Sequence, residues 1–173
     1  MNREKLFLQL LSDDLCALHA SALALENDWH RISLEIQSHK MDSLTERIGQ
    51  INCSGFAPIK AMLTEAGVTA RPGDQARAAQ SGVLADTELH ARRADTRRLG
   101  TSSAISIMRR SARYMELYCS SIADSALRLR LDDLASHLRA WARDWIGLEL
   151  TLNSVAASPR DSVRAREETA YAA

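Results

Sequence analysis

Apolar residues recur in the first third of the chain at spacings of three and four, the period of one helix face. The first series predicts a helix over residues 3–28 and consists of Leu11, Leu15, Leu18, Ala22, Leu25 and Trp29. The second series predicts a helix over 31–51 and consists of Ile32, Ile36, Leu44, Ile48 and Ile51. The segment NCSG at 52–55 is typical of a helix end, since Gly55 can take the left-handed cap conformation. A short third helix is expected between Pro58 and Gly67.

The same spacing continues without a miss in the last third of the chain. One series predicts a helix over 102–127 and contains Ile105, Met108, Ala112, Met115, Cys119, Ile122 and Ala126. The next predicts a helix over 127–156 and contains Leu127, Leu131, Leu134, Leu138, Trp141, Trp145, Leu148, Leu152 and Val155. Alternate spacings of three and four form a heptad seam, the apolar stripe through which helices pack together. Because few residues separate the two series, we expect an antiparallel hairpin with a tight turn near 126–130.

Two segments lack this pattern. Residues 70–100 hold few large apolar side chains, so they are interpreted as a polar connection with local helix near 86–98. Residues 157–173 are polar and are expected to be a flexible tail. The sequence therefore predicts an all-α protein, with one domain over 1–156. Its architecture would be an antiparallel four-helix bundle of two helical hairpins joined by the connection.

The composition bears on the cellular compartment of the protein and on its possible binding partners. Lys plus Arg and Asp plus Glu both number 22, so no net field attracts nucleic acid or an anionic membrane. The three cysteines are far apart, which fits neither a disulfide framework nor a zinc motif. Asp13 and Asp14 interrupt the first apolar run, so no signal peptide is expected. No window approaches a run of about 18 uncharged apolar residues, so no membrane span is expected. A cytoplasmic protein is the resulting expectation.

The stretch DDLASHLRAWARDW at 132–145 combines carboxylates, a histidine and two tryptophans, as a metal site can. In the heptad pattern the leucines and tryptophans occupy the seam, while Asp133 and His137 lie on its flank. A metal centre inside a bundle needs ligands that point to its middle from several helices. We therefore expect Trp141 and Trp145 to be core residues.

The layout resembles the ferritin-like superfamily, in particular small bacterial four-helix proteins of unassigned function. The resemblance is carried by SHKMDSLTERIGQI at 38–51, by MLTEAG at 62–67 and by ARYMELYCSSIAD at 112–124. It implies a ferritin-like fold, with Glu116 near a third-helix ligand position and His39 near a second-helix one. The sequence departs from the superfamily by having no Glu-x-x-His pair, so a di-iron centre is not expected.

Several alternative sites stay open at this point. An unconventional ligand set for Fe, Mn or Zn would draw on acidic and histidine side chains of several helices, namely Glu35, His39, Glu116, Asp133 and His137. His39 could instead accept a phosphoryl group, as in histidine phosphotransfer bundles, although their lysine–glycine pair is absent. The arginines of HARRADTRRL at 90–99 could contact nucleic acid, but no aromatic residue stands between them to stack on bases. Cys53 is the candidate for an exposed thiol.

At each of these candidate positions, a structural role is favoured over a catalytic or ligand-binding role. The leading prediction is therefore a non-enzymatic protein that acts through self-association or through a protein partner. A metal-binding or oxidoreductase bundle and a histidine phosphotransfer bundle are the alternatives.

Overall fold

The computed structural model describes residues 3–36, 39–65 and 101–156, and these residues form four helices. The helices are α1 (Arg3–Ile36), α2 (His39–Glu65), α5 (Thr101–Arg128) and α6 (Asp132–Ala156). No strand occurs among the described residues, which confirms the all-α prediction for them. The predicted connection at 70–100 and the predicted tail at 157–173 lie outside these residues.

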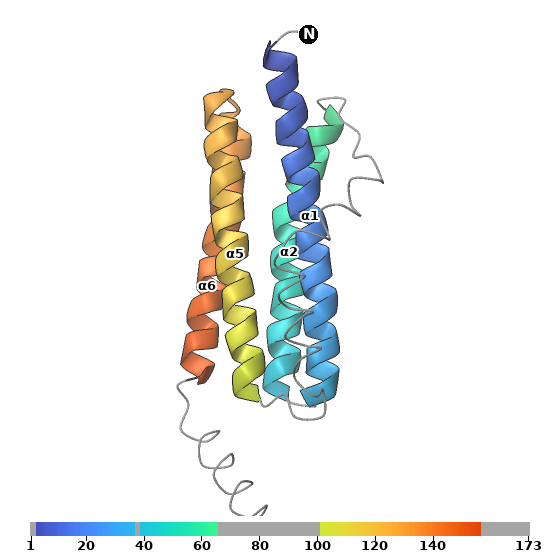
Figure 1. Cartoon of the computed structure of the whole chain (residues 1–173), viewed down its shortest axis with the longest axis vertical. Coiled ribbons are helices and arrows are strands. Elements are labelled where there is room, and N and C mark those ends of the chain that lie inside the picture. The colour runs from blue at the N-terminus through green and yellow to red at the C-terminus, as the bar shows by residue number, and fades with distance from the viewer. Residues whose placement is uncertain (1–2, 37–38, 66–100, 157–173) are drawn as a thin grey trace, which may run out of the picture.

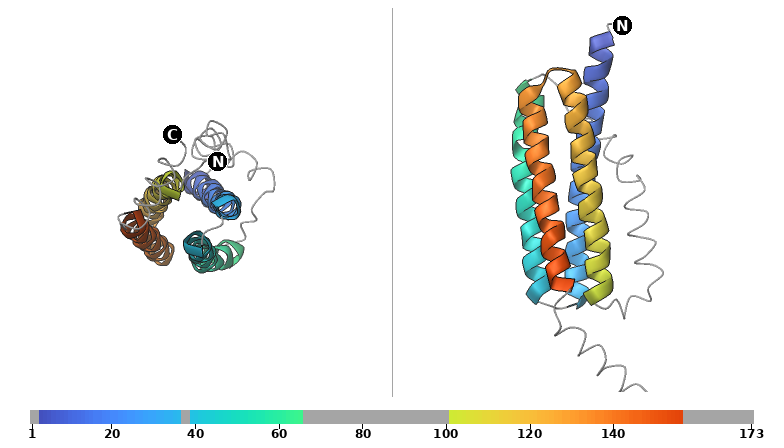
Figure 2. Two further views of the ribbon diagram at one scale, coloured as in Figure 1. Left: turned by 90° about the horizontal axis from the view of Figure 1, so that it is seen from below. Right: turned by 90° about the vertical axis from the view of Figure 1, so that its left-hand side faces the viewer.

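The four helices lie side by side around one core (Figures 1 and 2). The neighbouring pairs are α1 with α2, α5 with α6, α1 with α5, and α2 with α6. In Figure 1, α1 runs downward and α2 upward, while α5 runs upward and α6 downward. Helix α2 thus ends at the upper end of the molecule and α5 begins at the lower end. The first turns of α1 project beyond the other helices at the upper end (Figure 2).

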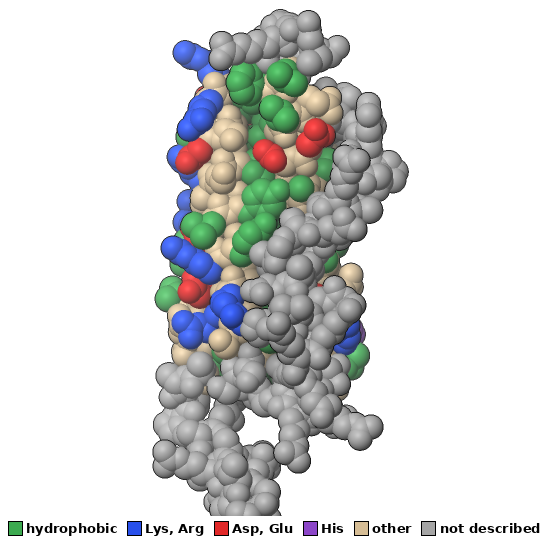
Figure 3. All heavy atoms as spheres, viewed as in Figure 1, with side chains coloured by type: hydrophobic (Ala, Val, Ile, Leu, Met, Phe, Trp, Pro, Cys, Tyr) green, Lys and Arg blue, Asp and Glu red, His purple; other side chains and the backbone are tan. Residues whose placement is uncertain are grey.

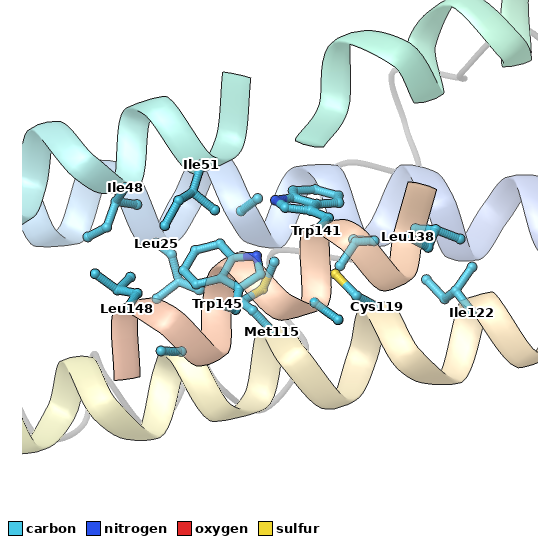
Figure 4. Packing of buried hydrophobic residues seen from close by; sticks show 14 of the residues in the cluster. Leu25, Ile48, Ile51, Met115, Cys119, Ile122, Leu138, Trp141, Trp145 and Leu148 are labelled. Carbon is cyan, nitrogen blue, oxygen red and sulfur yellow. The ribbon is translucent and has the colours of Figure 1, made fainter. Parts of the chain in front are cut away.

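The core is built from the seam positions that the sequence predicts. All six members of the first series are buried, and so are all seven members of the series in α5. In α6 the seam positions from Leu134 to Leu152 are buried. Leu127 near the end of α5, Leu131 in the turn and Val155 of α6 are partly buried and pack against the same cluster. Trp29, Trp141 and Trp145 are among the largest fully buried side chains. The prediction that the WARDW tryptophans are core residues is confirmed (Figure 4).

The first helix is longer than predicted. No break occurs near residues 28–31, and α1 continues to Ile36. The segment contains no Gly or Pro that would end a helix, and Trp29 and Ile32 prolong the buried stripe. Ile32 and Ile36 therefore belong to α1 and not to the second helix.

The predicted helix end at NCSG is also wrong, because α2 runs through Gly55 and Pro58 to Glu65. The side chain of Asn52 acts between helices: its Nδ2 donates hydrogen bonds to the carbonyl oxygen of Ala22 at 3.0 Å and to Oε2 of Glu26 at 2.9 Å. Gly55 lies inside the helix against α6, so packing overrides its tendency to end helices.

The turn between α5 and α6 lies where the sequence predicts it. Leu131 N–H donates to the Ala126 carbonyl, and Arg130 N–H donates to the Leu127 carbonyl, both at 3.0 Å. This pair of hydrogen bonds is the Schellman motif that ends many helices. Arg130 occupies its left-handed position with φ = 58°, where glycine is usual.

Helix α1 is apolar enough to pass a simple test for membrane spans. The segment Leu6–Leu34 has a mean hydropathy of 1.2, and it is the one such segment in the described part of the chain. A core helix passes the same test, and 39% of this segment is buried in the structure. The expectation that the protein has no membrane span stays a prediction.

Candidate functional site

Gly55 of α2 lies directly against Trp141 of α6. A Cβ atom added to Gly55 would lie 2.2 Å from Cε2 and Nε1 of Trp141, so only glycine leaves room for this indole. His137, one turn before Trp141 on α6, is half-buried, and its Nε2 lies 2.8 Å from the Gly55 carbonyl oxygen. The Nε2–H tautomer donates this hydrogen bond. His137 therefore links α6 to α2 through its Nε2.

The remaining candidate ligands that the structure describes are separate from His137. Glu116 pairs with Arg113 of its own helix, with Nη1 and Oε2 2.8 Å apart. Ser120 Oγ donates to the other carboxylate oxygen of Glu116 at 3.5 Å. Asp133 is exposed at the first turn of α6. Among the described residues no three His, Cys, Asp or Glu side chains lie close enough to hold a metal ion.

His39 and His137 are too far apart to bind the same ion. His39 begins α2, whereas His137 contacts Gly55, which lies 16 residues further along that helix. At a rise of about 1.5 Å per residue the two positions are about 24 Å apart along the axis. The five predicted ligands therefore cannot surround one ion in this arrangement. A smaller set with Glu35 and His39 stays a prediction, because those two side chains lie outside the described residues.

A di-iron centre of ferritin type does not fit the interior of the four helices either. Such a centre needs carboxylates and histidines that face the middle from all four helices. The residues of the core cluster are leucine, isoleucine, methionine, alanine, tryptophan and one cysteine, Cys119. The proposed role of His39 as a phosphoacceptor depends on a side chain that the structure does not describe, and the arginines at 92–98 lie outside the described residues.

The thiols differ in exposure as the sequence suggests. Cys53 is exposed, although it lies within α2 and not in a loop, while Cys16 and Cys119 are buried. Burial and the nearby Glu116 raise the pKa of Cys119 to about 12. Cys53 is therefore the accessible thiol of the described residues.

A ring stack joins α1 and α2 near their middle. The rings of His19 and Phe56 are parallel within 7°, with centroids 3.3 Å apart. Burial, and then the charge of Lys60, lowers the pKa of His19. The neutral imidazole is therefore the form that the folded protein favours.

A cavity of about 360 Å³ opens at the upper end of the molecule. Its walls come from the first turns of α1, the last turns of α2 and the start of α6. The apolar side chains that line it are Leu8, Leu11, Leu15, Ile59, Met62, Leu131 and Leu134. Arg130, Asp132 and Asp133 bring both signs of charge to the same cavity. Asp133, predicted as a metal ligand, is thus found beside an apolar cavity.

Four of the nine exposed large apolar side chains of the described residues lie at the same end. Leu6, Phe7, Leu8 and Leu10 are 42–51% exposed on the projecting turns of α1. Further down, Leu23, Leu34, Leu117, Ile146 and Leu150 are exposed on three helices. Figure 3 shows hydrophobic side chains on this face, at the upper end and in a strip below it. The seam pattern does not reveal this feature, although five of the six residues in LFLQLL at 6–11 are large and apolar.

The apolar end of α1 and the cavity beside it are therefore the features of the described residues best suited to binding. No family model matches the chain, and neither a curated protein nor a solved structure matches it.

Proposed function

We propose that this chain is a cytoplasmic, non-enzymatic four-helix protein that acts through self-association or through a protein partner. The observation that carries the proposal is the contrast between its interior and its upper end. The interior is filled with apolar side chains, whereas four neighbouring large apolar side chains of α1 stay exposed. Exposed patches of this kind mark interaction surfaces in soluble proteins.

The proposed architecture is an antiparallel bundle of ferritin-like type. The contacts between neighbouring helices and the helix directions in Figure 1 support it. A single long connection between two hairpins also supports it, because ferritin-like folds have one such crossover. Glu65 and Thr101, which this connection must join, lie at opposite ends of the molecule.

Two measurements on the full chain test the proposal. Sedimentation velocity over a wide range of concentration should show species heavier than the 19.1 kDa chain, unless the partner is a different protein. Elemental analysis by mass spectrometry, on protein purified without chelator and then given Fe(II), should find no stoichiometric metal. One or two metal ions per chain would overturn the proposal and favour the oxidoreductase alternative.

A further inference from the structure

We draw no further inference here: the strongest candidate, the apolar cavity between the first turns of α1, the last turns of α2 and the start of α6 with the exposed apolar side chains beside it, is lined by charges of both signs, and nothing in the part of the chain that the structure describes shows what covers it.

Discussion

Replacing Gly55 by alanine should lower the free energy of unfolding by about 2 kcal/mol, although alanine is the better helix former. The added Cβ would lie 2.2–2.3 Å from three atoms of the Trp141 ring. That ring is buried and cannot swing into solvent, because only 1% of Trp141 is exposed. Alanine must therefore push α2 and α6 apart.

The magnitude is the difference between two opposing effects. Forcing an extra carbon into a packed core costs about 1–3 kcal/mol, and a contact with three ring atoms belongs at the upper end. Alanine in place of glycine inside a helix returns about 0.5–1 kcal/mol. The net loss of about 2 kcal/mol corresponds to a fall in Tm of about 4–8 °C for a chain of this length.

Urea unfolding followed by circular dichroism measures this loss. Gly147→Ala is the matched control, since the one neighbour of its added Cβ is Nη2 of Arg47, at 3.9 Å. That variant should gain about 0.5–1 kcal/mol. A Gly55→Ala protein as stable as the wild type would refute the argument that Gly55 exists to admit Trp141.

A double-mutant cycle locates the effect in this pair. Trp141→Phe gives the added methyl group more room, and it also removes a buried indole N–H that has no acceptor among the described residues. In the Trp141→Phe background, Gly55→Ala should cost at least about 1 kcal/mol less than it does in the wild type. Equal costs in both backgrounds would place the strain elsewhere on α2.

Three further predictions concern the turn, the thiols and the ring stack. Arg130→Gly should raise the free energy of unfolding by about 0.5–1 kcal/mol in urea titrations, because relief of the left-handed strain exceeds the added flexibility of the unfolded chain. With a disulfide reagent at mildly alkaline pH, one thiol of the native chain, Cys53, should react rapidly, and all three thiols should react in the unfolded chain. Rapid reaction of Cys119 in the native chain would contradict its burial. The lowered pKa of His19 stabilises the fold above the ordinary value of 6.5, and this contribution is lost as the pH falls below that value. His19→Phe, which keeps a ring against Phe56, should therefore lose less stability than the wild type between neutral pH and about pH 5; equal losses would show that His19 does not contribute.

The seam residues of the core could be predicted because their spacing is a local property of the chain. Ile105 to Ala126 and Leu134 to Leu152 are buried as the heptad pattern requires. The bounds of α1 and α2 could not be predicted in the same way. At Gly55, the residue type favours a helix end. Glycine is needed inside the helix because the ring of Trp141, 86 residues later, occupies the space of a Cβ atom.

The candidate site likewise depends both on residue types, which the sequence shows, and on contacts between distant residues, which it does not show. Asp133 and His137 were candidate ligands because of their residue types. In the structure, His137 hydrogen-bonds the Gly55 carbonyl oxygen, and Asp133 lies beside the cavity. The cavity itself depends on how three helices end together, which no spacing in the sequence encodes. The exposed apolar start of α1 corresponds to LFLQLL at 6–11, where apolar residues extend beyond the seam positions.

The short turn between α5 and α6 has a consequence for the order of folding. Three residues join these helices, whereas 35 residues separate α2 from α5. The entropy lost on closing a loop grows with its length, so the α5–α6 hairpin should form in the folding transition state before α2 docks on it. The contact between Gly55 and Trp141 then forms late. Gly55→Ala should accordingly speed unfolding several-fold and leave the folding rate nearly unchanged, whereas Arg130→Gly should speed folding.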